Sequence, residues 1–267
     1  MTTTVALTRE VSETFARCEL THVARVPIDV DRARRQHAAY CEAPRELGCH
    51  VVVLPADERS PDCVLVEDVA LVVDELAVVL RPGAASRRGE AAPVGEAWAR
   101  YRPVARIDAP DTVDGGDVLR LGRQVFVGRS GRTSSGGIAR LDALLAPLGY
   151  DVRSVEVRGC LHLKTAVTQV APGVLLMNRA WVEAAPWPGF DVIDVDPAEP
   201  MAANALLVGD RVLCADAFPR TIARLRAAGL APLAIDVSEI AKAEGGLTCC
   251  SLIFAAPAGL LASGDDV

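Results

Sequence analysis

The stretch Gly245–Ser251 (GGLTCCS), close to the end of the chain, brings together two glycines, a threonine hydroxyl and two thiols. A glycine pair lets the backbone turn tightly or approach a ligand closely. A cysteine becomes a nucleophile only as a thiolate, so it needs a histidine or charged groups nearby. Neighbouring side chains of an extended segment point to opposite sides, so only one of Cys249 and Cys250 faces a given site. The stretch is therefore a candidate for nucleophilic catalysis.

One histidine lies in a setting that suits acid–base chemistry. His162 lies in the apolar run Cys160–Thr165 (CLHLKT), where its charged form is costly without an acidic partner. A histidine that only completes a core is the alternative, and it is the more common outcome. The other three histidines lie in polar or helical contexts and receive no catalytic role: His22, His37 and His50.

Three groups of polar loops carry charges that suit binding of a small ligand. Acids follow an apolar run in Leu54–Asp68, and such a cluster suits a planar guanidinium, with a solvated acidic loop as the alternative. Arg81–Arg88 ends in two arginines, which either decorate the surface or hold an anionic group such as a carboxylate. Asp114–Asp117 (DGGD), with Gly131–Thr133 further on, either places a carboxylate beside a base or forms a tight turn.

These loops lie between copies of a recurring unit, in which two β-type apolar runs form a hairpin. The turns fall near residues 74, 122, 172 and 209, within the hairpins Val69–Leu80, Val118–Gly128, Val167–Met177 and Leu206–Ala215. A stretch of helical character follows each hairpin: Ser86–Tyr101, Ile138–Leu148, Arg179–Ala185 and Pro219–Ala228. A repeat of this length is typical of solenoids, propellers and rings, and an ordinary α/β sandwich is the alternative. In a ring, the polar loops would converge on one centre.

A fifth unit is predicted from the two ends of the chain together. Val5–Leu7 and Val51–Leu54 are apolar runs on either side of a predicted helix over Asp31–Leu47. Leu252–Phe254, two positions after the cysteine pair, would close this unit. The thiols would then lie where the last part of the chain joins the first.

The composition narrows the class of protein. The chain has 267 residues, 51% of them hydrophobic, which is enough for a substantial core. A net charge of −7 argues against nucleic acid as a partner and favours a small cationic ligand. There is no run of roughly 18 apolar residues for a membrane span, and no signal peptide is indicated. The eight cysteines show no CxxC or CxxH spacing, so we expect a reduced, cytoplasmic protein without a zinc site.

Together, these motifs resemble the dimethylarginine dimethylaminohydrolases of the pentein, or amidinotransferase, superfamily. The matching stretches are Leu54–Asp68, Arg81–Arg88, Thr112–Asp117, Val127–Thr133, Leu161–Thr165, Ala202–Asn204 and Gly245–Ser251. They span most of the chain in order. The resemblance implies an α/β fold, a five-bladed α/β propeller of pseudo-fivefold ββαβ repeats, formed by residues 1–267 as a single catalytic domain.

The resemblance also implies the catalytic roles. Cys249 looks like the nucleophile, because it occupies the first position after the Gly-Gly-x-Thr run. His162 resembles the general acid and base, and Asp114 its orienting carboxylate, where some relatives have glutamate. Six residues resemble groups around the substrate, with the acids on the guanidinium, the arginines on the α-carboxylate and the leucine in a mobile lid: Asp62, Glu67, Asp68, Arg87, Arg132 and Leu20.

The implied reaction is hydrolysis of Nω-methylated arginines to citrulline and an amine through a covalent S-alkylthiouronium on Cys249. No metal or other cofactor is expected, and a homodimer is compatible with the resemblance. Lys164 follows His162 by two positions, where related deiminases have an aspartate, so we expect methylated arginines rather than arginine as substrates. The alternatives are another pentein enzyme such as an arginine deiminase, a binding module without turnover, and a redox pair of Cys249 and Cys250.

Overall fold

The computed structural model describes residues 2–183 and 187–260 of the chain, and within them the strands form five three-stranded sheets. In chain order the strands are β1 (Thr2–Arg9), β2 (His50–Leu54), β3 (Ala70–Val72), β4 (Ala77–Val79), β5 (Val104–Arg106), β6 (Val118–Leu121), β7 (Gln124–Arg129), β8 (Asp151–Glu156), β9 (Val167–Ala171), β10 (Val174–Met177), β11 (Asp191–Asp194), β12 (Leu206–Val208), β13 (Arg211–Ala215), β14 (Leu233–Ile235) and β15 (Ser251–Pro257). Each sheet is one blade of a ring.

Helices and short 3₁₀ turns connect these strands. The α-helices are α1 (Val30–Glu46), α2 (Ala91–Trp98), α3 (Ser135–Leu145), α4 (Leu163–Ala166), α5 (Pro219–Ala227) and α6 (Ser238–Ala241). The 3₁₀ turns are η1 (Phe15–Arg17), η2 (Val66–Val69), η3 (Ala85–Glu90), η4 (Gly115–Asp117), η5 (Ala146–Leu148), η6 (Thr248–Cys250) and η7 (Ala258–Leu260). No helix in the described part of the chain is long and apolar enough to cross a membrane.

The blades share one pattern, in which an antiparallel hairpin is followed by a third strand parallel to its second strand. This order holds for β3-β4-β5, β6-β7-β8, β9-β10-β11 and β12-β13-β14. The four predicted hairpins are therefore confirmed. The third strands are short or partly exposed, so no apolar run marks them, and only the implied ββαβ repeat predicts them.

The fifth blade closes the ring by joining the two ends of the chain. Strand β1 pairs antiparallel with β15, with Thr8 opposite Ser251, and parallel with β2, with Leu7 opposite Val52. The predicted unit is thus confirmed. Phe254 on β15 packs against Trp98 of α2, with ring centroids 4.5 Å apart, so the last strand also anchors the neighbouring blade.

Most of the predicted helices are present, with local reasons for their ends. The helix predicted over Asp31–Leu47 is α1, whose first turn is capped by the carboxylate of Asp29 accepting from the Arg32 N–H at 2.9 Å. Helix α5 begins at Pro219, and Gly229 follows its end with a φ of +84°. The predicted stretch Ser86–Tyr101 divides into η3 and α2, and Ile138–Leu148 into the end of α3 and η5.

The prediction of helix over Arg179–Ala185 is wrong for residues 179–183, and Ala184 and Ala185 lie outside the described residues. The segment makes turns and an isolated bridge between Val157 and Val182. The carbonyl of Trp181 accepts from the Arg158 N–H at 2.9 Å. Backbone groups that bond to the residues after β8 are not available to a helix, which explains the difference.

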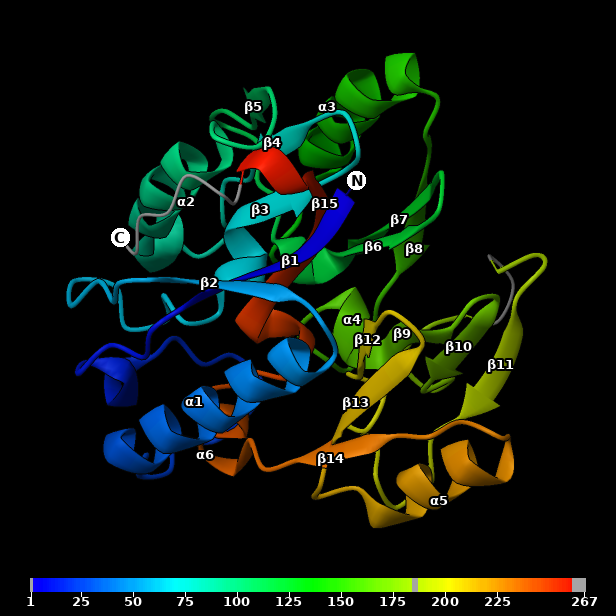
Figure 1. Ribbon diagram of the computed structural model, residues 1–267. Coiled ribbons are helices and arrows are strands. Elements are labelled where there is room, and N and C mark those ends of the chain that lie inside the picture. The colour runs from blue at the N-terminus through cyan, green and yellow to red at the C-terminus, as the bar shows by residue number, and fades with distance from the viewer. Residues whose placement is uncertain (1, 184–186, 261–267) are drawn as a thin grey trace.

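In the ring, α1, α2, α3 and α5 lie on the outside and α4 lies close to the centre (Figure 1). Counting β15 as the first strand of the blade that it forms with β1 and β2, the first strand of each blade begins at this centre, directly after a short turn or, for β12, two residues after one. Those turns are η2 before β3, η4 before β6, α4 before β9, residues 201–203 before β12, and η6 before β15. The fold therefore brings five short segments, far apart in the sequence, to one place.

Because Phe254 links the closing strand to α2, we expect Phe254→Ala to lower the free energy of unfolding by about 3–5 kcal/mol. The ring of Phe254 contacts both Trp98 and Tyr101, so its loss leaves a cavity between two blades. Urea unfolding followed by circular dichroism measures the change. Met201→Ala is the control, because this side chain is exposed and its truncation should change stability by no more than about 0.5 kcal/mol. Equal effects of the two changes would contradict the role of Phe254.

Candidate active site

The turns at the centre of the ring enclose a small cavity. Its lining contains six of the nine predicted site residues together with five others: Asp62, Asp68, Arg87, Arg132, His162 and Cys249, with Glu19, Leu65, Leu161, Ala243 and Glu244. The structure thus brings the predicted nucleophile and the predicted acid–base to one site. The free space is about 10 Å³, which is room for one water molecule.

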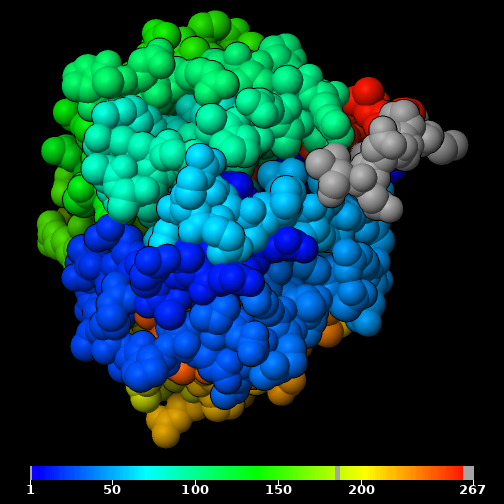
Figure 2. Space-filling view, turned by 90° about the vertical axis from the view of Figure 1, so that its left-hand side faces the viewer, coloured from blue at the N-terminus to red at the C-terminus, as the bar shows by residue number. Residues whose placement is uncertain are grey.

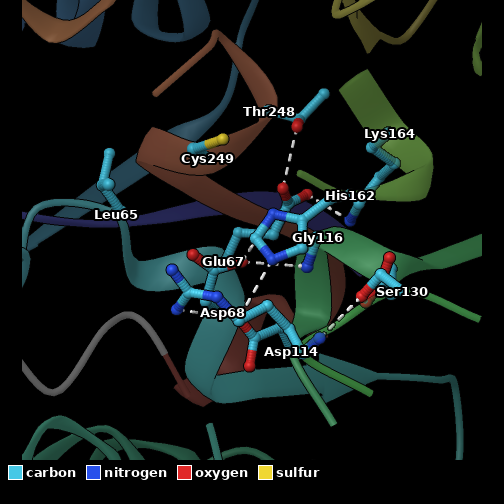
Figure 3. A network of polar contacts seen from close by, with 12 residues as sticks. Leu65, Glu67, Asp68, Asp114, Gly116, Ser130, His162, Lys164, Thr248 and Cys249 are labelled. Carbon is cyan, nitrogen blue, oxygen red and sulfur yellow. Dashed lines mark hydrogen bonds and ion pairs between the residues drawn. The ribbon is translucent and has the colours of Figure 1, made fainter. Parts of the chain in front are cut away.

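His162, directly before α4, lies between two carboxylates (Figure 3). Its Nε2 donates to Asp114 Oδ2 at 3.0 Å, and its Nδ1 lies 3.9 Å from Asp68 Oδ1. Burial alone would lower the pKa of His162, but the charge of Asp68 and the hydrogen bond to Asp114 raise it to about 9. The imidazole is therefore protonated on both nitrogens, and positively charged, at neutral pH. A Cβ on Gly116 would lie 2.4 Å from His162 Nδ1, so the DGGD turn needs glycine there to make room for the ring.

Cys249 lies in η6, and its Sγ accepts from the Gly246 N–H at 3.3 Å. Burial, together with the negative charges of Glu67 and Asp68, raises the pKa of the Cys249 thiol to about 12. Cys249 is therefore a neutral thiol in this state of the site. An added positive charge beside it would favour the thiolate.

Cys250 points away from the cavity. Its side chain is fully buried in the hydrophobic core, and its Sγ donates to the Gly246 carbonyl at 3.6 Å. The two cysteines lie in a 3₁₀ turn rather than in an extended segment, so the strict alternation assumed from the sequence is wrong here. The separation of the two thiols nevertheless holds, because one lines the cavity and the other packs in the core.

Asp68 and Glu67 reach the centre from η2, and each is bound to a cation. Asp68 pairs with Arg87 and accepts from the Gly116 N–H at 3.0 Å. Burial opposes ionisation of Asp68, but His162 and Arg87 hold its pKa below its usual range. Glu67 does not line the cavity. It pairs with Lys164 and accepts from Thr248 Oγ1 at 2.8 Å, next to Cys249.

The two predicted arginines differ in how strongly they are held. Arg87 is buried and pairs with both Asp68 and Glu90, with 2.8 Å from Nη2 to Glu90 Oε2. Arg132 borders the cavity, donates to Thr21 Oγ1 at 2.7 Å and lies 3.9 Å from Asp114 Oδ2. Arg132 is therefore the freer of the two to bind an incoming anion.

The segment Glu19–Val23, in the N-terminal part of the chain, contacts residues that line the cavity. Asp62 accepts from the Glu19 N–H at 3.0 Å, and Glu244 accepts from three successive backbone N–H groups, those of residues 21 to 23. Leu20 lies in this segment, is partly buried against the core and does not line the cavity. Its predicted place in a lid stays a prediction.

Three residues to which the sequence analysis gave no individual role organise the site. Asp117 is fully buried and accepts from the Leu163 N–H at 3.0 Å and Thr133 Oγ1 at 2.7 Å, so it fixes the turn that follows His162. Glu244 has a φ of +58°, unusual for a residue other than glycine. Its position directly before the glycine pair is the one signal that the sequence offers.

Asn204, the third of these residues, links η6, the turn that carries Cys249, to α4. Its Nδ2 donates to the Lys164 carbonyl at 3.2 Å and to Thr248 Oγ1 at 3.1 Å, and its Oδ1 accepts from the Thr248 N–H at 3.0 Å. A Cβ on Gly246 would lie 2.4 Å from the Asn204 side chain, so the glycine permits this close packing. The sequence contained Asn204 only as the end of a matching stretch.

One group of side chains in the described residues has the geometry of a metal site. Ligand atoms of Asp68, Asp114 and His162 lie within 4.8 Å of one another. His162 hydrogen-bonds to Asp114, and Asp68 pairs with Arg87, so these groups already satisfy one another. This pairing favours proton transfer over metal binding as their chemistry.

A ring of five ββαβ blades around a buried cysteine, a histidine and several acids defines a pentein. No protein-family model matches the chain. It is 40% identical over 253 residues to a dimethylarginine dimethylaminohydrolase of Streptomyces coelicolor, covering 92% of this chain and 95% of the relative. It is 36% identical over 228 residues to that of Pseudomonas aeruginosa, covering 85% and 90%. The chain belongs to the dimethylarginine dimethylaminohydrolase family.

A solved structure agrees with this assignment. A cysteine-to-serine variant of the Pseudomonas aeruginosa protein, in complex with citrulline, superposes with a TM-score of 0.89 at 33% identity. The match covers 93% of this chain and 98% of that one. The likeness confirms the predicted pentein fold over nearly the whole chain.

Because Asn204 holds the turn that carries Cys249, we expect Asn204→Ala to increase the rate at which iodoacetamide alkylates Cys249. The change removes the hydrogen bonds to Thr248, so the turn loosens and the thiol becomes more exposed. Mass spectrometry of the Cys249 peptide gives the rate. Asn178→Ala is the matched control, since Asn178 bonds to the Pro200 carbonyl outside the site. Identical alkylation rates in the two variants would show that Asn204 does not hold the turn.

The raised pKa of Cys249 predicts the pH dependence of its alkylation in the free protein. A thiol that stays protonated until about pH 12 has a thiolate fraction that grows about tenfold per pH unit between pH 7 and 10. We expect the rate with iodoacetamide, a neutral reagent, to rise steadily over this range. Urea-unfolded protein is the control, and its rate should level off near the ordinary thiol pKa. A plateau near pH 7 in the folded protein would contradict the environment described for Cys249.

Proposed function

We propose that this chain hydrolyses Nω-methylated arginines, asymmetric dimethylarginine and monomethylarginine, to citrulline and dimethylamine or methylamine. The observation that carries the proposal is that Cys249, His162 and Asp68 border one buried cavity. The family supports it, because relatives at 36% and 40% identity are dimethylarginine dimethylaminohydrolases. The citrulline complex of the Pseudomonas aeruginosa protein supports the same product.

The charge of the substrate explains how Cys249 becomes reactive. The negative charges of Glu67 and Asp68 contribute to its raised pKa. A guanidinium bound between these acids and the thiol would offset those charges, so ionisation of Cys249 is coupled to substrate binding. His162 meanwhile keeps its proton, since its pKa lies near 9. The site thus holds both a thiolate and an acid in the bound state.

The reaction then follows in two stages. The Cys249 thiolate adds to the guanidinium carbon, and the C–N bond to the methylated nitrogen breaks as His162 gives its proton to the departing amine. An S-alkylthiouronium remains on Cys249. His162, now neutral, accepts a proton from water, whose oxygen attacks the same carbon. The C–S bond breaks, which releases citrulline, and Asp114 orients the imidazole through both stages.

Substrate contacts are proposed from the charges around the cavity. Asp62 and Asp68 line the cavity and would hold the guanidinium. Glu67 was predicted for the same role, and because it does not line the cavity it would act there through its charge. Arg132 would hold the α-carboxylate, because among the described residues its guanidinium has one hydrogen bond, to Thr21 Oγ1, and one carboxylate nearby, that of Asp114 at 3.9 Å. Arg87 was predicted for the same role, and its pairs with Asp68 and Glu90 also suit it to fixing Asp68 in place.

Substrate entry requires the cavity to open, because about 10 Å³ cannot hold a guanidinium. The segment Glu19–Val23, with Leu20 within it, is the proposed lid. Its contacts to Asp62 and Arg132 use the atoms proposed to hold the substrate. Substrate would therefore exchange places with the lid contacts as it enters.

Lys164 supports methylated arginines over arginine. It pairs with Glu67, so the position two residues after His162 brings a cation to the guanidinium site where deiminases have an aspartate. Because the residue at this position is not an acid, the site does not require an N–H on the leaving nitrogen. Arginine deimination is the alternative, and it would need an acid at this place.

Citrulline formation from asymmetric dimethylarginine tests the proposal. We expect Cys249→Ser and His162→Gly each to lower turnover by a factor of roughly a thousand or more, since each removes a group that forms or breaks a bond. Cys250→Ser, which changes a thiol in the core, should keep most of the activity. Free arginine should be turned over far more slowly. Loss of activity in Cys250→Ser alone, or equal turnover of arginine, would overturn the assignment.

Three further statements about the chain are proposals. We take residues 1–267 as one catalytic domain, because the last strand β15 completes the first blade. A cytoplasmic location is supported by the cysteines, all of which are free thiols. A homodimer stays a prediction.

A further inference from the structure

A second cavity lies between two blades, outside the candidate active site. It has a volume of about 300 Å³ and is formed by β1, β2 and the residues after β2 on one side, and by α2 and the residues after it on the other. Its apolar walls include Leu7, Val52, Leu54, Ala97 and Tyr101. In the space-filling view, the light-blue residues around 50–60 adjoin the green residues around 90–100 on this face (Figure 2).

Arg9, at the end of β1, lies in this cavity wall and is 4% exposed. Its Nε donates to the Pro55 carbonyl at 3.0 Å. Its Nη1 is buried and has no hydrogen-bond partner among the described residues. No described carboxylate lies within 4.0 Å of the guanidinium. Glu96 lines the same cavity but does not pair with Arg9. A guanidinium is always charged, and a buried charge without a paired counter-ion is unfavourable, so Arg9 lacks an anionic partner.

Two arginines that line another cavity nearby are paired. A neighbouring cavity of about 420 Å³ is lined by Arg34 and Arg45. Arg45 pairs with Glu42, and Arg34 lies 3.8 Å from Asp31. Arg9 therefore differs from them both in its burial and in its lack of a carboxylate partner.

We propose that this cavity binds a small apolar carboxylic acid, with its carboxylate on the Arg9 guanidinium and its hydrocarbon body against the apolar walls. The planar donors of arginine match a carboxylate, and an anion there supplies the missing counter-ion. The exposed Arg100 and the exposed Glu96 also line the cavity and offset each other, so the buried Arg9 supplies its net positive charge. The volume lies at the lower end of the range for small-molecule sites, so a body of about eight carbons suits it.

The cavity beside Arg9 is separate from the candidate active site. Pro55, which Arg9 holds, begins the loop that leads to Asp62, while Cys249 and His162 border the other cavity. An occupant on Arg9 would contact the base of that loop and leave the central cavity free. The site therefore holds a second ligand at the same time as the substrate.

Isothermal titration calorimetry with octanoate tests the proposal. We expect one octanoate per chain, with binding that persists when citrulline saturates the central site. Octylammonium and 1-octanol carry the same hydrocarbon body without the negative charge, and both should bind at least tenfold more weakly. Equal binding of the three probes, or no octanoate binding, would overturn the proposal.

Two variants locate the probe. Arg9→Met should weaken octanoate binding at least tenfold, and without ligand its melting temperature should match or exceed that of the wild type, because an unpaired buried charge is removed. Ala97→Leu narrows the same cavity and should weaken octanoate binding while keeping Arg9. Arg45→Met, in the neighbouring cavity, is the matched control and should leave binding unchanged. Octanoate binding that survives both Arg9→Met and Ala97→Leu would place the probe elsewhere and refute the assignment.

Discussion

The site depends on the hydrogen bond between protonated His162 and Asp114, with Asp68 on the other side of the imidazole. It keeps a charged imidazole in a buried position, where burial alone would remove its proton. Asp68 and Asp114 belong to other blades than His162. The charge on the imidazole is therefore stable only when the ring of blades is closed. Six buried carboxylates surround the centre: Asp62, Glu67, Asp68, Glu90, Asp114 and Asp117. His162, Lys164 and two arginines balance them incompletely, and this excess of negative charge suits a cationic ligand.

The five blades explain how one chain assembles this cluster. Each blade begins at the centre with a short turn, and each turn supplies different chemistry on the same scaffold. The turn before β3 contributes carboxylates, α4 follows the histidine, and η6 contributes the thiol. Asn204, from the turn before β12, supplies no reacting group and instead bonds to its neighbours on both sides. The repeat thus fixes where a side chain lies, and the residue type at each turn decides what it does.

The sequence predicted the hairpins well because each is a pair of apolar runs around a turn. It could not mark β11 or β14, which are short and partly exposed, and it placed helix where residues 179–183 bond to the residues after β8. His162 was a candidate from its residue type and apolar context, and the resemblance chose Cys249 over Cys250. Asp117 was noted only within the DGGD motif and Glu244 not at all, because both act through backbone N–H groups of segments distant in sequence. Such contacts follow from the closed ring, and no local pattern encodes them.

Burial raises the pKa of the Cys249 thiol, and contacts of the segment Glu19–Val23 help to keep the cavity beside it closed. Glu244 adopts a backbone conformation that is unfavourable for most residues, by about 1–3 kcal/mol, and gains hydrogen bonds from three backbone N–H groups of this segment. In so small and buried a cavity, the carboxylates act more strongly on the thiol than they would in water. As the proposed lid, the segment would admit both water and a cation on opening, and only the cation would offset the carboxylates once the segment closed again. A site built this way holds its thiol neutral until a ligand of the right charge is enclosed.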